Sequence, residues 1–276
     1  MTSRFNTIRV GLSIRQKAVE FALHGRFQLV HDDGSTDPIR EGRYHATVAE
    51  ACRGPRWGLR LRSFQAASDA ETFAGRARRN ELPSEVHRLG RELRDGNGND
   101  LAPYVWVVTA GDFQTEAQAS AGAEELIAPH ADNLGLRAYP DQWLQFDALR
   151  INRPEGGRVR IESENGTSFT LASPGRIEPL DEAARFELAE VRIGIDFHWD
   201  HVERLSFRGA LDLAVDGEAL TAVNEVDIES YLLSLLGSEM RSDWPKEALA
   251  AQAVAARSTI LATRGRHHYG EAFDLC

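Results

Sequence analysis

Two apolar stretches joined by a short polar link, within residues 223–257, constrain the fold of this chain more than any other feature. The first stretch begins at Asp227, a residue type suited to a helix N-cap, and it reaches Gly237, a residue type suited to a helix end. Between these two residues, apolar side chains recur at helical spacing, at Ile228, Leu232, Leu235 and Leu236. The sequence therefore predicts a helix that begins after Asp227 and ends at Gly237.

The second stretch predicts another helix. Ser242 or Asp243 is suited to cap it, and Pro245 is expected in its first turn, where a missing N–H costs little. Residues 248–256 are almost all small. Alanine has the highest helix propensity, and small side chains let another backbone come close. We therefore expect two packed helices that meet at a corner.

Glu239 falls in this corner, near the start of the second helix. A carboxylate in such a place can be partly buried and still face a cleft, which is the setting of a general acid. The alternative interpretation is a solvated acid or a helix cap, because most acidic side chains are exposed. The residue pattern by itself leaves both interpretations open.

The same residues resemble a known family. The run Val-Asn-Glu-Val-Asp-Ile-Glu-Ser-Tyr-Leu-Leu-Ser-Leu-Leu-Gly-Ser-Glu-Met is followed, after a short link, by Trp-Pro-Lys-Glu-Ala-Leu-Ala-Ala-Gln-Ala-Val-Ala-Ala-Arg. These runs resemble the core signature of the SpoIID/LytB family (stage II sporulation protein D and amidase enhancers), whose catalytic members are lytic transglycosylases of bacterial peptidoglycan. The resemblance places Glu239 at the family's catalytic glutamate, and it places Arg257 at the Arg of an Ala-Ala-Arg motif in the active-site cleft.

Arg257 has two alternative roles. The resemblance implies that it binds substrate, but its guanidinium is also suited to an ion pair with Glu247 or Glu239. Ser258-Thr-Ile follows Arg257 where the family commonly has Thr and then an aromatic residue. Loss of that aromatic residue would weaken the stacking of a sugar ring.

The resemblance implies an enzyme that cleaves the β-1,4 bond between MurNAc and GlcNAc. Glycoside cleavage usually needs two carboxyl groups that flank the bond. Lytic transglycosylases use one Glu, which protonates the leaving oxygen and then helps the muramyl 6-hydroxyl attack, giving 1,6-anhydroMurNAc without a cofactor. The alternatives are a non-catalytic, glycan-binding enhancer of an N-acetylmuramoyl-L-alanine amidase, and a structural protein. The expected partners are peptidoglycan glycan strands and, for an enhancer, that amidase.

Three candidate zinc ligands lie near the end of the sequence: His267, His268 and Cys276. Some members of the resembled family bind zinc through His and Cys in this region, with further ligands beyond a Phe-Asp-Leu-Cys motif. A closed structural site needs four ligands, so these three make an incomplete site. The resemblance implies a structural zinc in the intact protein, and it implies that the catalytic region is truncated in this chain, because the family pattern continues beyond Phe-Asp-Leu-Cys. The alternative is a polar helix end with an unpaired thiol.

Composition excludes several classes of function. The formal net charge of −10 argues against general nucleic-acid binding, which needs a basic surface. Two cysteines do not make a disulfide framework, and no apolar run reaches the length of a transmembrane helix. No secretory signal is visible at the N-terminus, although the resemblance implies an extracytoplasmic location in the cell envelope.

We expect an α+β fold in four parts. Residues 1–50 are β-rich, residues 51–135 form a βα insert, residues 136–190 form a β-rich connector, and residues 191–276 form the SpoIID-type region, with strands followed by two helices. The resemblance covers this last part well and residues 1–50 loosely.

A repeat relates the first part to the last. In each, a strand is followed by a glycine, Gly25 or Gly209, then by a second strand and an Asp-Gly pair, at residues 33–34 or 216–217. The alternative is two unrelated hairpins with similar turns. His198-Trp199 in the second copy also resembles a family feature.

The insert shows two βα halves. Runs that begin at Trp57 and Tyr104 each predict a strand, then Phe-Gln, then a helix, and the two strands are expected to share one sheet. The second helix is predicted at residues 115–127, with inward positions at Ala117, Ala121 and Leu126. These halves resemble a SPOR-type glycan-binding module, with a plain α/β insert as the alternative. Residues 82–103 predict a polar loop, and its run Asp-Gly-Asn-Gly-Asn-Asp at 95–100 lacks the spacing of an EF-hand.

Overall fold

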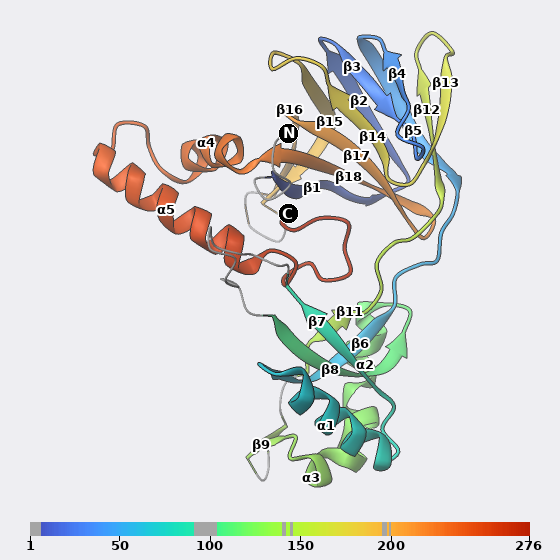
Figure 1. Ribbon diagram of the computed structural model, residues 1–276, viewed down its shortest axis with the longest axis vertical. Helices are drawn as coiled ribbons and strands as arrows, with labels where there is room; N and C mark the ends of the chain where they lie inside the picture. The colour runs from blue at the N-terminus through green and yellow to red at the C-terminus, as the bar shows by residue number, and fades with distance from the viewer. Residues whose placement is uncertain (1–6, 91–103, 140–141, 144–145, 195–197, 199) are drawn as a thin grey trace. The chain divides into compact units, whose positions relative to one another are not determined.

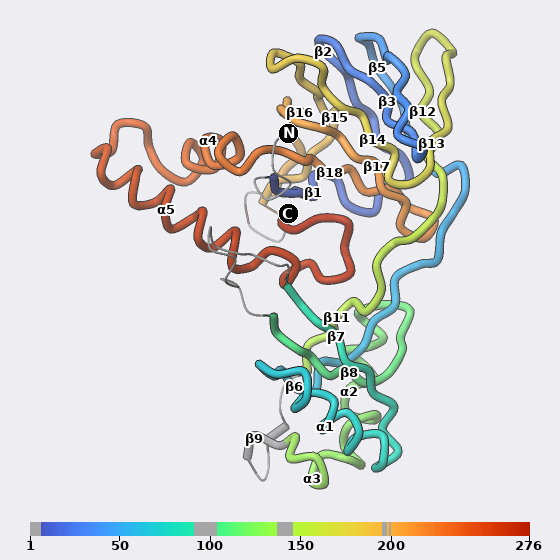
Figure 2. The backbone as a smooth tube through the Cα atoms, in the orientation of Figure 1, coloured from blue at the N-terminus to red at the C-terminus, as the bar shows by residue number. Residues whose placement is uncertain are grey.

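The structure is a computed structural model that describes residues 7–90, 104–139, 142–143, 146–194, 198 and 200–276. Figure 2 traces the chain through two compact units. The first unit consists of Met1–Gly54, Pro154–Ala262 and Ala272–Cys276, and the second consists of Pro55–Arg153 and Thr263–Glu271. The expected four parts are therefore interleaved, because the β-rich start of the chain and most of the last part share one unit.

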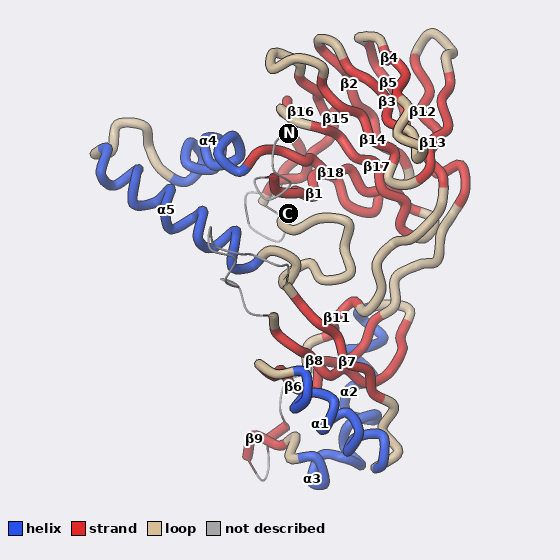
Figure 3. The backbone as a smooth tube through the Cα atoms, in the orientation of Figure 1, coloured by secondary structure: helices blue, strands red, loops and turns tan. Residues whose placement is uncertain are grey.

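Two antiparallel six-stranded sheets build the first unit, as Figures 1 and 3 show. The first sheet contains, in spatial order, β1 (Thr7–Gln16), β18 (Ala219–Asp227), β17 (Ala210–Asp216), β14 (Gly175–Pro179), β3 (Phe27–Val30) and β4 (Thr36–Ile39). The second sheet contains, in spatial order, β13 (Ser168–Ala172), β12 (Arg158–Ser163), β5 (Gly42–Glu50), β2 (Ala18–His24), β15 (Arg185–Ile193) and β16 (His201–Phe207).

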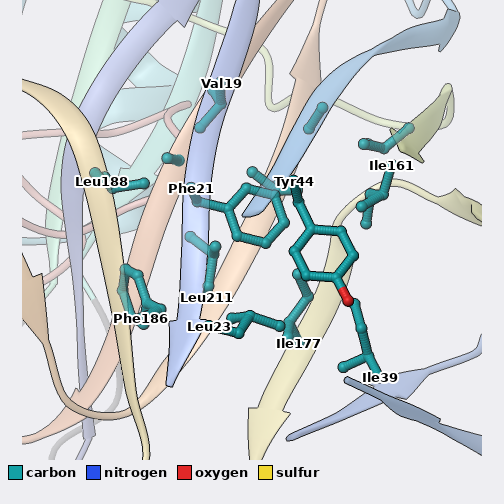
Figure 4. Packing of buried hydrophobic residues seen from close by; sticks show 14 of the residues in the cluster. Val19, Phe21, Leu23, Ile39, Tyr44, Ile161, Ile177, Phe186, Leu188 and Leu211 are labelled. Carbon is teal, nitrogen blue, oxygen red and sulfur yellow. The ribbon is translucent and has the colours of Figure 1, made fainter. Parts of the chain in front are cut away.

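One apolar core draws its residues from both sheets. Val19 and Phe21 of β2 are buried while Glu20 between them is exposed, which is the alternation of a strand with one inward face. Phe21 stacks on Tyr44 of β5 with the ring centroids 5.4 Å apart (Figure 4). Leu211 of β17 joins the same cluster from the first sheet. The core thus forms only when strands distant in sequence assemble.

The predicted repeat is visible in its later strands. Gly25 precedes β3 and Gly209 precedes β17, with φ values of 97° and 92°. A Cβ on Gly209 would lie 2.4 Å from the carbonyl oxygen of Glu225, so the turn requires glycine. The hairpins β3–β4 and β17–β18 follow. The first strands differ, because β1 lies in the first sheet and β15 in the second. Trp199 lies outside the described residues.

Helices α4 (Ile228–Glu239) and α5 (Lys246–Thr263) follow β18, which confirms the predicted order of strands and then two helices. Ile228 of α4 and Ile260 of α5 share an apolar cluster with Ile8 of β1. Figure 1 shows the helices extending away from the sheets. Within the described part of α5, Ile260 is the buried residue. The expected close backbone packing of residues 248–256 is therefore not found.

The second unit contains one four-stranded antiparallel sheet covered by helices. Its spatial order is β11 (Ala148–Arg150), β6 (Trp57–Phe64), β8 (Val105–Phe113) and β7 (Ser84–Leu89). Its other elements are α1 (Ala67–Arg79), α2 (Glu116–Ile127), a 3-10 turn (Ala128–His130), α3 (Ala131–Leu134), β9 (Arg137–Tyr139) and β10 (Gln142–Trp143). β6 pairs with β8, so the prediction that the two βα halves share one sheet is confirmed. The chain order is that of a split βαβ fold.

Two predictions within this unit are wrong. Part of the expected loop at 82–103 is strand β7, because residues 84–89 pair with β8. The Asp-Gly-Asn-Gly-Asn-Asp run lies outside the described residues. In α2, Ala117 and Ala121 are exposed, whereas Ala119 and Ile127 are buried. Leu126, the third predicted inward residue, does pack against the core, so the inward face contains Ala119, Leu126 and Ile127.

The second face of this sheet is covered by residues 263–271. Val107 points to the face opposite Val108 because neighbouring strand residues alternate, and it packs with Leu89, Leu149 and Tyr269. The Arg150 guanidinium, 2% exposed, pairs with Glu271 at 2.7 Å. Residues directly after α5 are therefore part of the second unit's own packing.

Candidate functional site

Helix α4 begins as predicted and ends later than predicted. The Asp227 carboxylate accepts a hydrogen bond from the Ser230 N–H at 3.1 Å, which confirms the predicted N-cap. Gly237 does not end the helix, since α4 continues to Glu239 and Met240 is its C-cap. Glycine ends a helix where the glycine itself adopts a left-handed backbone, and Gly237 has no positive φ here. Glu239 is therefore the last residue of α4.

The link between the helices is a tight polar turn. Arg241 holds Asp243 with two hydrogen bonds of 3.0 and 2.7 Å, and the Trp244 N–H donates to the Arg241 carbonyl at 3.2 Å. The Pro245 carbonyl accepts hydrogen bonds from the first turn of α5. Neither Ser242 nor Asp243 is thus the cap, because Pro245 occupies the position just before the helix and Asp243 is engaged by Arg241.

Glu239 is an exposed carboxylate that is oriented by α5. Its Oε2 accepts a hydrogen bond from the Gln252 side-chain amide at 2.7 Å. This bond joins the end of α4 to the second turn of α5, so the corner expected from the sequence exists and contains Glu239. Of the two interpretations that the sequence left open, partial burial and solvent exposure, the structure shows the exposed one for Glu239.

Arg257 forms an ion pair, with a different partner from the two predicted. Its Nε and Nη2 donate to the two oxygens of Glu229 at 2.8 and 2.6 Å, a bidentate arrangement across the helix hairpin. The hydrogen bonds from Arg257 hold the pKa of Glu229 below its ordinary value. The same contact raises the pKa of Arg257. Glu229 lies in the first turn of α4, where its sequence position indicates only a helix-start role.

Tyr231 and Gln252 are site residues that the sequence pattern did not single out. Burial raises the pKa of Tyr231, and negative charges at Glu239 and Cys276 raise it further. Tyr231 also packs in the cluster that seats α4 on the sheet. Both residues belong to the two predicted helices. The spacing of apolar residues predicts the helices, but it does not show which polar side chain lies near Glu239.

The candidate zinc ligands are divided between the two units. His267 and His268 belong to the second unit, and Cys276 belongs to the first. No group of three or more His, Cys, Asp or Glu side chains among the described residues is arranged to hold a metal ion. The three candidate donors are one fewer than a closed zinc site needs, so a structural zinc in the intact protein stays a prediction.

The last five residues pack on the first sheet. The Gly11 N–H donates to the Leu275 carbonyl at 2.7 Å, and the Phe273 ring, 4% exposed, lies against Gly11. Arg9 donates to the Ala272 carbonyl at 2.8 Å. The segment 272–276 is therefore part of the packing around β1, near the base of the two helices.

No helix in the described part of the chain is long and apolar enough to cross a membrane. A protein of Brachyspira hyodysenteriae, itself uncharacterized, is 44% identical over 54 residues, which are 20% of this chain and 15% of that protein. A solved structure of an exported-protein candidate from Burkholderia pseudomallei is 11% identical, with 65% of this chain and 26% of that one covered. Its TM-score of 0.29 does not establish a shared fold.

A family model gives the match that identifies the helical region. The model described as SpoIID, stage II sporulation protein, matches residues 216–276, which include β18, both helices, Glu239 and Arg257. The match gives no support to the SPOR-type interpretation of residues 51–135. Residues 216–276 of this α+β protein therefore match the SpoIID family, a family linked to peptidoglycan remodelling.

Proposed function

We propose that this protein is a peptidoglycan lytic transglycosylase that cleaves the MurNAc–GlcNAc β-1,4 bond, with Glu239 as the single acid and base. The observation that carries the proposal is the position of Glu239. It lies at the corner of the helix hairpin within the SpoIID match, exposed to solvent and oriented by the Gln252 amide at 2.7 Å. A general acid must be accessible to its substrate and correctly oriented, and the Glu239 carboxyl group meets both requirements.

The neighbouring acids support a mechanism with one carboxyl group. Asp227 caps α4, Glu229 holds Arg257 in a bidentate pair, and Asp243 is held by Arg241. Glu239 instead has a neutral amide as its hydrogen-bond partner. A two-carboxylate glycosidase needs a second acid that serves as a base or nucleophile. Here we assign that role to a hydroxyl of the substrate.

The reaction then proceeds without water. The protonated carboxyl of Glu239 gives its proton to the glycosidic oxygen, the bond from that oxygen to the anomeric carbon of MurNAc breaks, and the GlcNAc 4-hydroxyl leaves. The resulting carboxylate takes the proton from the MurNAc 6-hydroxyl, whose oxygen forms the new bond to the anomeric carbon. Glu239 is thereby protonated again, and the product is a 1,6-anhydro ring.

Arg257 is assigned to the substrate-binding surface of the same hairpin. Its guanidinium is fixed by Glu229 and is about one-third exposed, with a side-chain exposure of 36%. A planar cation that is held in one orientation can bind carboxylate or hydroxyl oxygens of a ligand with little further loss of entropy. The cell-wall context of the SpoIID family implies glycan strands as the ligand and an extracytoplasmic location for the protein.

Mass spectrometry of digested glycan tests the proposal. Purified peptidoglycan and peptide-free glycan strands are incubated with the wild type, with Glu239→Gln, and with Glu247→Gln as a matched control in the first turn of α5. We expect anhydromuramyl ends from the wild type and the control, and none from Glu239→Gln. Intact strands with all three proteins, alongside retained binding of the strands, would instead favour a non-catalytic enhancer of an amidase.

A further inference from the structure

We propose that Trp244 is a saccharide-stacking residue of the same site, which contacts a sugar ring close to the bond that Glu239 cleaves. The inference rests on the proposed function and adds a substrate contact to it. Trp244 lies in the turn between α4 and α5, five positions after Glu239 in the sequence.

The exposure of Trp244 is the first observation. Its side chain is 49% exposed in a chain whose core buries most large apolar groups. Tryptophan joins a wide apolar ring to one N–H donor, and such side chains are concentrated at surfaces that bind ligands. A single exposed apolar residue needs no explanation by itself. Whether the exposure of Trp244 indicates ligand binding therefore depends on the residues around it.

The backbone beneath Trp244 is held in place. The Trp244 N–H donates to the Arg241 carbonyl at 3.2 Å, and Arg241 also binds Asp243 through two hydrogen bonds. Pro245 follows, and its carbonyl begins α5. A ring that is carried by a closed turn between an ion pair and a proline loses little backbone freedom when it binds a ligand. The turn is thus suited to present the ring rather than to let it move freely.

The polar groups of the corner favour a carbohydrate over an apolar partner. The Glu239 carboxylate and the Gln252 amide together offer hydrogen-bond acceptors and donors, which match hydroxyl groups. The flat faces of a pyranose carry C–H groups, and these pack on an aromatic ring. A site that orients a ligand through a few polar groups beside an aromatic surface is the usual composition of a small-molecule or sugar site.

The spacing favours a chain of sugars rather than one ring. Gln252 is the seventh residue of α5, so it lies about 9 Å along the helix axis from the first residue, at a rise of about 1.5 Å per residue. Because Gln252 holds Glu239, the acid and Trp244 are separated along the start of α5. Trp244 precedes α5 whereas Glu239 is held two turns into it, an arrangement that suits a ligand of several sugar rings, such as a glycan strand.

Binding measured in a protein that does not cleave separates this inference from the proposed function. The variant Glu239→Gln serves as the background, and peptide-free glycan strands are the probe in a co-sedimentation or calorimetric titration. We expect Trp244→Ala to weaken binding at least tenfold in this background, and Trp244→Phe to retain most of the affinity because it keeps an aromatic face. Val254→Ala, which truncates an exposed apolar side chain on α5 (59% exposed), is the matched control and is expected to bind normally.

The possible outcomes separate the role of Trp244 from the proposed function. Equal affinity of Glu239→Gln with and without Trp244→Ala would overturn the role of Trp244 and leave the proposed function intact. A change in oligomeric state without a change in glycan affinity would also overturn it, and would indicate a second copy as the partner of the ring. Failure of Glu239→Gln to bind the strands, together with an inactive wild type, would refute the proposed function and this inference with it.

Discussion

The contact between Gly11 and Phe273 provides a quantitative test of how the C-terminal segment supports the helical region. A Cβ added at Gly11 would lie 2.9–3.0 Å from three atoms of the Phe273 ring, closer than an ordinary contact. Such overpacking costs about 1–3 kcal/mol. Removal of the buried ring by Phe273→Ala costs about 3–5 kcal/mol, through lost burial and the cavity that remains. We expect Gly11→Ala and Phe273→Ala to destabilise the first unit by these amounts.

The double variant distinguishes this contact from two unrelated defects. Once Phe273 is alanine, the clash is absent and the new methyl group occupies part of the cavity. Gly11→Ala should therefore cost nothing in that background, which gives a coupling energy of about 1–3 kcal/mol in a double-mutant cycle.

Because a chain with two compact units need not unfold in a single step, stability is measured by hydrogen exchange of peptides from β1 and β2 during a urea titration. Additive effects of the two substitutions, within about 0.5 kcal/mol, would refute the packing argument.

Three further predictions concern the polar contacts. Asp227→Ala should destabilise α4 by about 1 kcal/mol through loss of the N-cap, measured by urea denaturation, with Asp227→Asn as the tolerated control. Arg257→Met should return the pKa of Glu229 toward its ordinary value in an NMR titration; because the native pKa is lowered, the pair stabilises the protein above a pH of about 4 and loses this effect as the pH falls. Glu271→Gln should weaken the charged contact to the buried Arg150 and cost about 1–3 kcal/mol, so that residues 263–271 lose exchange protection while Glu124→Gln, at an exposed position of α2, changes nothing.

The helical region could be predicted from the sequence because its signals are local. The spacing of apolar residues after Asp227 requires one helical face, and the cap is made by residues three positions apart. These local signals are sufficient to place Glu239 at the corner between the helices. They do not give its exposure, because burial depends on which element covers a side chain. The partner of Arg257 was missed for the same reason, since Glu229 lies 28 residues away.

The architecture of the first unit could not be predicted at the same level. Alternation indicates strands within residues 7–50 and 154–227, but β1 pairs with β18, a strand far away in the sequence. Nothing in a local pattern shows that residues 263–271 complete one unit and residues 272–276 pack in the other. The error at β7 has a similar cause, because a polar strand is stabilised by its neighbour in the sheet rather than by its own composition.

Digestion of glycan strands in ¹⁸O-labelled water is the measurement that tests the central claim most directly. If Glu239 directs the 6-hydroxyl of MurNAc to the anomeric carbon, the new ends are 1,6-anhydro rings that contain no ¹⁸O, and Glu239→Gln yields no new ends. New reducing ends that carry ¹⁸O would show that water is the nucleophile and would contradict the mechanism. Strands that stay intact with the wild-type protein would contradict the assignment of catalysis to Glu239.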